Sequence, residues 1–278
     1  MGGFLVSAAR NLITPVVQIA WIMPLLLAAE LLLPMGKVSP LSRVRGLLFL
    51  LLYLIVTAAI TVGTRAAVTA MHIGPLFSLH VSEHLGPLGR FAAGASAALF
   101  FMFALDFFTY WTHRAQHAWP WLWRFHAVHH SITELSALNA FNHWSEQIMR
   151  LPAVTIPMAL LIPANLNPLP FVMGLGLIDG YFVHAATRLH FGPLRRVLVD
   201  SHMHRIHHSI QPEHFNTNFG VFTTIYDQMF GTAHFPAPGE WPETGVREFP
   251  EPLDTAAFLF WPWRRQSSVQ KDQIASRA

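Results

Sequence analysis

Three short stretches of the sequence carry histidines at helical spacing. His113 and His117 are four residues apart, and residues 126–130 (HAVHH) and 204–208 (HRIHH) each place three histidines within five positions. Residues three and four apart share one face of an α-helix, so each stretch points its imidazoles in one direction. Neutral imidazole binds Zn, Fe, Cu and Ni, and eight histidines exceed the four ligands of one tetrahedral ion. The spacing therefore predicts two metal ions with coordination positions left open for a substrate or oxygen.

Two plainer explanations fit the pattern less well. A polar helical surface does not require three spaced repeats of the same residue. A histidine-rich tract that binds metal adventitiously has low complexity, whereas up to 73 residues separate these stretches. Carboxylates that fix imidazole tautomers are expected around such a site. The available candidates are Asp106, Glu146, Asp179, Asp200 and Asp227.

The composition indicates a membrane protein. Charged residues make up 12% of the 278 residues, about half the share in a soluble domain, and 53% are hydrophobic. So few charges cannot cover a water-facing surface, and so many aromatics exclude a disordered chain. The absence of cysteine excludes disulfides, thiolate metal sites and iron–sulfur clusters. No basic run with interleaved aromatics is present, so no nucleic-acid partner is expected.

Apolar stretches predict an all-α polytopic fold. Residues 12–33, 46–64 and 91–111 are each long enough to span a bilayer. Residues 151–183 are also apolar but are broken at 163–168 (PANLNP), which predicts a helical hairpin that enters and leaves on one side. The expected architecture is three spanning helices, this hairpin, and a cytosolic helical cap that holds the histidines. The N-terminal stretch is interpreted as a retained anchor.

Basic residues predict the orientation of these helices. The groups expected on the cytoplasmic side are Lys37, Arg43 and Arg45; Arg114, Arg124 and Arg150; and Arg188, Arg195, Arg196 and Arg205. The N-terminus and residues 65–90 would then lie outside, although Arg10, Arg65 and Arg90 reduce the bias. We expect membrane helices and an outer loop in residues 1–99, the histidine region in 100–235, and an extension in 236–278 that ends in a polar tail.

The order of the motifs resembles the sterol desaturase / fatty acid hydroxylase superfamily. The resemblance covers about residues 100–235 and includes residues 106–114 (DFFTYWTHR) before the first histidine pair. Residues 218–220 (NFG) and 226–232 (YDQMFGT) follow the last histidines, with Tyr226 where the family commonly has Trp. The resemblance implies a helical transmembrane base with a cytosolic cap that holds two Fe²⁺ ions.

The resemblance also implies the ligand set. It assigns eight histidines from the three stretches and a ninth after the hairpin: His113, His117, His126, His129, His130, His184, His204, His207 and His208. His143 is a weaker candidate, because Trp144 replaces the family's Pro. Some hydroxylases have one more histidine where this chain has Arg188, which implies one ligand fewer. Asp106, Arg114, Glu146 and Asp227 are expected to support the ligands, and no separate nucleophile or base is expected.

The implied activity is O₂-dependent hydroxylation or desaturation of a C–H bond in a sterol, fatty acyl chain or related lipid. An external reductase, ferredoxin or cytochrome would supply electrons, because the sequence has no G-x-G-x-x-G fingerprint. We expect the inner membrane of a bacterium, with the histidines on the cytoplasmic side. The alternatives are a zinc-dependent membrane hydrolase and a metal transporter. The sequence leaves the lipid and the oligomeric state open.

The remaining histidines have weaker expectations. His190 and His202 are expected to be polar neighbours of the site, and His214 to be solvated beside it. His72, His80 and His84 are expected in the outer loop at the membrane interface. His234 has no expected role.

Overall fold

The computed structural model describes residues 2–72, 76, 86–161, 176, 178–247 and 249–263. Within these residues the regular secondary structure is helical, and β-pairing is confined to four isolated bridges. The predicted all-α fold is therefore confirmed for this part of the chain. The predicted outer-loop residues His80 and His84 and the polar tail lie outside the described residues.

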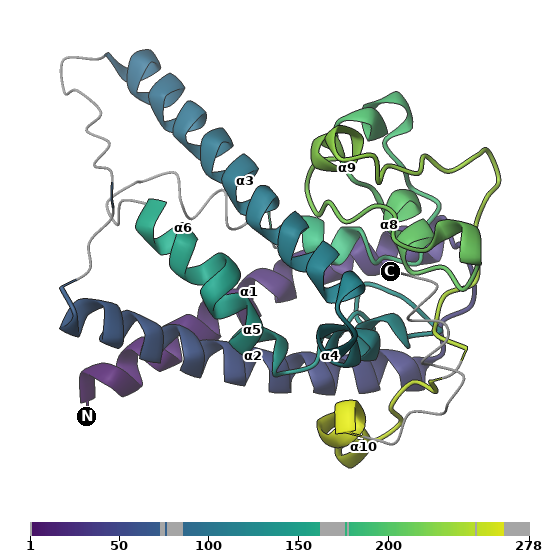
Figure 1. Ribbon diagram of the computed structural model, residues 1–278, viewed down its shortest axis with the longest axis horizontal. Coiled ribbons are helices and arrows are strands. Elements are labelled where there is room, and N and C mark those ends of the chain that lie inside the picture. The colour runs from purple at the N-terminus through teal and green to yellow at the C-terminus, as the bar shows by residue number, and fades with distance from the viewer. Residues whose placement is uncertain are drawn as a thin grey trace.

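Two long helices, α1 (Gly2–Leu32) and α2 (Pro40–Ala70), run in opposite directions and pack against each other (Figure 1). The third long helix, α3 (Pro87–Ala118), crosses the same half of the molecule obliquely. Pro40 and Pro87 begin α2 and α3, where a missing N–H costs no helical hydrogen bond. Apolar side chains then continue along each helix and supply its outward surface.

The first half of the predicted hairpin, with the helix before it, lies between α3 and α2 in Figure 1. It consists of α5 (Glu146–Arg150), a π-helical turn, η1 (Leu151–Thr155), and α6 (Ile156–Leu161). Pro152 has no N–H to donate, which accounts for the wider turn at this point. The returning arm is helical at residues 178–182. The turn of the predicted hairpin, residues 163–168, lies outside the described residues.

Two helices are long and apolar enough to cross a membrane within the described residues: Pro40–Thr64 and Pro87–Ala118, with mean hydropathies of 2.4 and 1.8. Only 11% of the α3 window is buried within the protein, so most of its apolar surface faces outward. The third predicted span lies in α1, where Val16–Leu32 is a shorter apolar stretch among the residues whose side chains are described. The count of three spans stays a prediction.

Short helices form the remainder of the molecule, beside α4 (Pro120–His130) on the right of Figure 1. In chain order they are η2 (Gly192–Arg196), α8 (Ser201–His207), η3 (Pro212–His214), α9 (Ile225–Met229), α10 (Thr255–Phe260) and η4 (Trp261–Trp263). Two apolar cores support this region. One joins α1 and α2 to the segment around Val183 and Met203, and the other packs α4 against α10 around Phe141 and Phe258.

Glu30 joins the membrane helices to the histidine region. Its side chain is buried near the end of α1, where its Oε1 atom accepts hydrogen bonds from the Ala137 N–H at 2.8 Å and the Ala186 N–H at 2.9 Å. Its Oε2 atom pairs with Arg43 of α2. This carboxylate, an interruption of the apolar stretch in the sequence, thus holds two loops and two helices together.

Replacing Glu30 with alanine should lower the free energy of unfolding by about 3–5 kcal/mol, because it leaves two buried N–H groups and a guanidinium without their acceptor. Thermal unfolding in detergent micelles measures the effect. Lys37→Ala removes an exposed charge from the same connection and serves as the control, with an expected change within about 0.5 kcal/mol. Equal melting temperatures for both variants would contradict the assigned role of Glu30.

Candidate metal centre

Pro120 sets the angle between the two helices that carry the first five histidines. His113 and His117 lie in the last turns of α3, which ends at Ala118. Trp119 is extended, with φ −105° and ψ 118°, as expected for a residue that precedes a proline. Pro120 then begins α4, whose C-terminal half carries His126, His129 and His130. The change of direction turns both histidine faces toward the same interior.

Asp200 starts the helix that carries the last three histidines. Its side chain accepts hydrogen bonds from the His202 N–H at 3.1 Å and the Met203 N–H at 3.0 Å, which is the usual arrangement of an N-cap. The short helix α8 presents His204 and His207, and His208 follows as its C-cap. Asp200 therefore supports α8 itself and not an imidazole.

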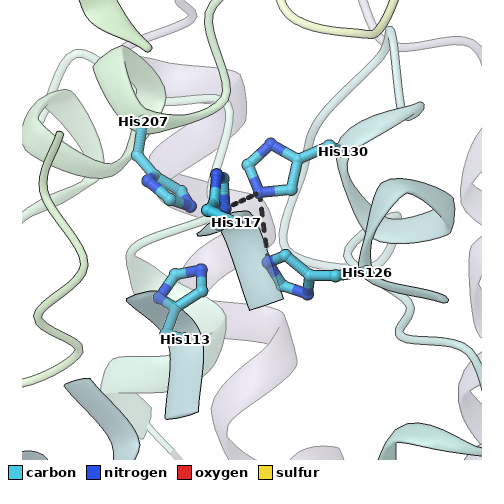
Figure 2. A group of neighbouring side chains, drawn as sticks. All are labelled: His113, His117, His126, His130 and His207. Carbon is cyan, nitrogen blue, oxygen red and sulfur yellow. Dashed lines mark hydrogen bonds between the residues drawn. The ribbon is translucent and has the colours of Figure 1, made fainter. Parts of the chain in front are cut away.

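Five imidazoles form the first of two groups, in which the ligand atoms lie within 4.8 Å of one another. Figure 2 shows their rings pointing toward a common centre from three elements, α3, α4 and α8. This five-histidine group consists of His113, His117, His126, His130 and His207. The His130 Nε2 atom lies 3.1 Å from that of His117 and 3.2 Å from that of His126. The Nε2 atoms of His113 and His207 are buried and have no hydrogen-bond partner.

Four imidazoles form the second group, also within 4.8 Å of one another. This four-histidine group consists of His129, His184, His204 and His208. The His184 Nε2 atom lies 3.1 Å from that of His129 and 2.9 Å from that of His204. His184 stands just past the returning arm of the hairpin, so this arm contributes directly to the group.

Backbone carbonyl groups fix the orientation of four rings. The Nδ1–H groups of these rings face carbonyl oxygens at 2.7–3.1 Å. The pairs are His113 with Phe219, His129 with Phe141, His184 with Gly180, and His207 with Thr217. A carbonyl oxygen only accepts, so each Nδ1 atom carries the proton and each Nε2 atom carries the lone pair. All four lone pairs are thus directed into the two groups.

These facing lone pairs fit a bound cation. His129 and His184 both donate from Nδ1, so no proton is left between their Nε2 atoms, which lie 3.1 Å apart. Two lone pairs at this distance repel each other in a buried site unless a positive ion lies between them. Two nitrogen ligands that each lie about 2.1 Å from an ion are about 3.0 Å apart when their bonds meet at a right angle, and about 3.4 Å apart in tetrahedral geometry. The residues present therefore fit a metal ion in each group.

Burial keeps six of these imidazoles neutral. Desolvation lowers the pKa of His184 to about 4 and that of His207 to about 3. It also lowers the pKa values of His129, His130, His204 and His208 well below 6.5, and the neighbouring imidazoles add to the effect. A neutral imidazole is the form that binds a metal ion, so at pH 7 the rings are ready to bind without losing a proton.

Residues 98–232 match the model of the fatty acid hydroxylase family. They contain all nine of these histidines together with the loops that orient them. The resemblance of this stretch to the sterol desaturase / fatty acid hydroxylase superfamily is therefore confirmed.

Curated relatives in this superfamily act on lipids or long-chain aldehydes, as their names state. The ornithine lipid hydroxylase OlsE of Rhizobium tropici is 32% identical over 51% of this chain and 43% of its own length. The alkylglycerol monooxygenase of Danio rerio is 32% identical over 46% of this chain and 28% of its own. The very-long-chain aldehyde decarbonylase GL1-6 of Oryza sativa subsp. indica is 28% identical over 46% of this chain and 21% of its own length. The chain thus spans less than half the length of these relatives. No solved structure matches it.

Among the four residues that the superfamily pattern suggested as supports, Glu146 alone faces a histidine directly. Its Oε1 atom lies 3.4 Å from the His126 Nδ1 atom, and its Oε2 atom accepts from Gln116 at 3.1 Å. Arg114 instead donates to the Tyr110 hydroxyl at 3.0 Å. Glu146 therefore adds a charged partner for the ring of His126.

Asp106 and Asp227 act on a loop that carries one of the orienting carbonyl groups. Asp106 is fully buried and accepts from the Val221, Phe222 and Thr223 N–H groups and the Thr223 hydroxyl, at 2.8–3.1 Å. Asp106 and Asp227 together therefore hold residues 219–223. The Phe219 carbonyl oxygen in this loop accepts from His113.

Asp227 holds the beginning of the same loop. It accepts from the Phe219 and Gly220 N–H groups, both at 2.8 Å. A Cβ atom on Gly220 would lie 2.2 Å from the Thr223 oxygen, so only glycine allows the loop to close this tightly. Burial raises the pKa of Asp227 to about 6, which leaves it ionised at pH 7.

A chain of hydrogen bonds joins Arg114 to this loop. Arg114 donates to the Tyr110 hydroxyl, which lies 2.9 Å from the Thr232 hydroxyl, and Thr232 donates to Asp227 at 2.7 Å. Arg114 thus contributes to the orientation of His113 only indirectly, through Tyr110, Thr232, Asp227 and Phe219.

His143 lies outside both groups. Its Nδ1 atom is 2.6 Å from the Ser145 hydroxyl and its Nε2 atom 3.3 Å from the Leu259 oxygen, so both ring nitrogens face protein atoms. The ring is fully buried among aromatic side chains that include Trp144 and Phe258. In this structure His143 tethers the C-terminal extension to the segment before α5.

The other histidines take varied positions. His214, expected to be solvated, is 1% exposed, because it packs against His234 and pairs with Glu240. His202 stacks on Trp241 with ring centroids 3.8 Å apart. His72 is exposed. The spacing of the histidines along the chain gave no indication that His214 and His234 contact each other.

The metal-free protein should lose stability in mild acid. His184 and His207 have depressed pKa values in the fold, so the unfolded chain binds protons that the folded chain does not between about pH 6.5 and 4. Stability is therefore full above about pH 6.5 and falls as the pH decreases. Melting temperatures of chelator-treated protein between about pH 7.5 and 5 measure this. Reloading with metal should raise the melting temperature at pH 7.5, and an unchanged melting temperature of the metal-free protein across this pH range would contradict the prediction.

Proposed function

We propose that the chain is a membrane-bound di-iron oxygenase that uses O₂ to hydroxylate a C–H bond in the hydrocarbon part of a polar lipid. The observation that carries the proposal is the pair of all-imidazole groups at one end of apolar helices. In this proposal, the nine histidines of the two groups are the metal ligands. The four-histidine group would hold one ion and the five-histidine group the other.

The choice of iron follows from the reaction. When bound, two iron ions supply the electrons to O₂ that oxidation of an unactivated C–H bond requires, which redox-inert zinc cannot do. The protein's own residues hold neutral imidazoles in one tautomer, exclude bulk water through burial, and keep the loop at residues 219–223 in place. The preference for iron over zinc thus rests on the proposed oxidation and not on ligand spacing.

A lipid substrate is supported by the outward surface of α3. Large apolar side chains are exposed along the same helix that ends in His113 and His117, including Phe100, Phe103 and Phe107. A hydrocarbon chain in the bilayer can therefore approach the metal centre along α3. The names of two relatives, a hydroxylase of ornithine lipids and a monooxygenase of alkylglycerols, favour oxygen insertion into a polar lipid over desaturation.

An external electron donor completes the reaction. A cavity of about 90 Å³ lies beside the five-histidine group, and its lining includes His117, His130 and His207 together with Asn216 and Arg247. This cavity brings open space next to the imidazoles of His117, His130 and His207, where a small molecule could come close to them. We propose that the donor is a reductase, ferredoxin or cytochrome.

The proposed location is the inner membrane of a bacterium, with the metal centre on the cytoplasmic side. The connection between α1 and α2 contains Lys37 and contacts the segment after His184, through hydrogen bonds from Met35 to Ala186 and from Arg188 to Leu33. The basic residues of this connection and the metal centre therefore lie at the same end of the helices, which the positive-inside rule assigns to the cytoplasm.

The two alternative functions are not supported. A zinc hydrolase would usually carry a carboxylate general base within a histidine motif, as in HExxH, but none of the three histidine stretches contains Glu or Asp. A metal transporter would line spanning helices with ligands at mid-membrane depth. Here the ligands gather at the C-terminal end of α3 and in the short helices beyond it.

Lipid analysis of cells with and without the protein tests the proposed function. We expect a polar lipid whose mass increases by one oxygen atom, together with O₂ uptake by membranes that contain the protein. A lipid that loses two hydrogens instead would show desaturation. Full activity of protein loaded only with zinc, or an unchanged lipid profile, would contradict the proposal.

A further inference from the structure

A third group of possible ligands lies apart from the two histidine groups. We propose that His214, His234 and Glu240 bind one additional divalent transition-metal ion, best matched by Zn²⁺, that fastens loops of the C-terminal region. Their ligand atoms lie within 4.8 Å of one another, and none of these residues belongs to either of the other groups. Two imidazoles and one carboxylate are a ligand set that zinc accepts, with a fourth position left for water.

The three side chains converge on one oxygen atom. The Glu240 Oε1 atom lies 2.9 Å from the His214 Nε2 atom and 3.8 Å from the His234 Nε2 atom. The two imidazole rings are 4.8 Å apart and inclined at 68°. Ligands of a tetrahedral ion are about 3.4 Å apart, so a small movement of His234 suffices. That side chain is 31% exposed and has room to move.

Surrounding contacts hold the ligands in this arrangement. The second oxygen of Glu240 accepts from the Ala237 N–H at 2.6 Å, which leaves Oε1 directed at the histidines. The Asn218 side chain accepts from the His234 N–H and donates to its carbonyl oxygen, both at 2.8 Å. The ligands are thus positioned before an ion binds.

An ion at this position would stabilise the metal centre from outside. His214 ends η3, and three residues later the Thr217 carbonyl oxygen accepts from His207 of the five-histidine group. The Thr217 hydroxyl donates back to the His214 oxygen at 2.7 Å. Fixing His214 to residues 234 and 240 therefore restrains the loop that orients His207. The ion would be structural, because its ligands contact neither histidine group.

The plain alternative is a hydrogen bond between His214 and Glu240, with His234 only nearby. Replacing His234 with asparagine distinguishes the two, because it removes a zinc ligand and leaves the His214–Glu240 pair intact. Glu240→Gln removes the charge while its amide oxygen can still accept from Ala237. His190→Asn, at an exposed histidine of the same region, is the matched control.

The test is elemental analysis of full-length protein in detergent after saturation with zinc and removal of excess ion. We expect wild type and His190→Asn to bind about one zinc ion more per chain than His234→Asn or Glu240→Gln. Zinc added to chelator-treated protein should also raise the melting temperature more for wild type than for His234→Asn. Equal zinc content in wild type and His234→Asn overturns the proposal, as does binding that needs zinc in large excess. Because lipid oxidation is not measured, the result is independent of the proposed function.

Discussion

The His129→Ala variant should give no detectable oxygenated lipid. His129 has its Nδ1–H on the Phe141 carbonyl and its Nε2 lone pair 3.1 Å from that of His184, so no other residue can take its place in the four-histidine group. Loss of residues that merely orient ligands costs about 10–100-fold in activity or metal affinity, and loss of a ligand should cost more. Lipid analysis of expressing cells and metal content per chain together measure the effect.

His72→Asn is the control for this variant. His72 is exposed after α2 with φ 53°, a backbone conformation that asparagine adopts readily. It should retain wild-type product and metal content. Full product from His129→Ala would show that the four-histidine group is not part of the reacting centre. Loss of product with normal metal content would place the role of His129 elsewhere than in ligation.

The Asp106→Ala variant should be the most strongly destabilised of the variants outside the histidines. Alanine leaves three buried N–H groups and one hydroxyl without their acceptor, at about 1–3 kcal/mol for each unpaired group. We expect a loss of at least about 4 kcal/mol in unfolding free energy. The Phe219 carbonyl then no longer holds His113 in place, so metal in the five-histidine group should be released about 10–100-fold more readily.

Metal release under a chelator and melting temperature in micelles separate the two effects of Asp106→Ala. Asp254→Ala removes a partly buried hydrogen bond at the N-terminus of α10, with an expected cost of about 1 kcal/mol and no change in metal release. If Asp106→Ala unfolds before it can be purified, Asp106→Asn retains one acceptor oxygen and should show a smaller change of the same sign. Wild-type metal retention in a folded Asp106 variant would contradict the link from Asp106 to His113.

Much of the histidine geometry was predictable from spacing. Residues three and four apart in 126–130 share a face of α4, and Pro120 predicts a helix start that the structure contains. The carbonyl groups of Phe141, Gly180, Phe219 and Thr217 were not predictable, since every residue has a carbonyl oxygen and only the folded path selects one. For this reason the expected carboxylate partners proved mostly indirect, with Asp106 and Asp227 acting on a loop.

The division of the imidazoles was equally hidden from spacing. The spacing suggests that the histidines of one stretch bind the same ion. Instead, α4 divides its histidines between the two groups, and so does the segment from His204 to His208. This division depends on the direction of each ring around the helix axis and on the approach of His184 from a distant arm. Such directions follow from tertiary packing, in which Met203 and Val183 join the same apolar core.

Two pairs of adjacent histidines, His129-His130 and His207-His208, are each divided between the groups, with one ring in each group. His130 and His208, from different groups, also stack with ring centroids 4.3 Å apart and an angle of 17°. An ion bound in one group therefore immobilises backbone that the other group also needs. The conformational entropy lost with the first ion is not lost again with the second, so loading should be positively cooperative, with chains that carry either two ions or none.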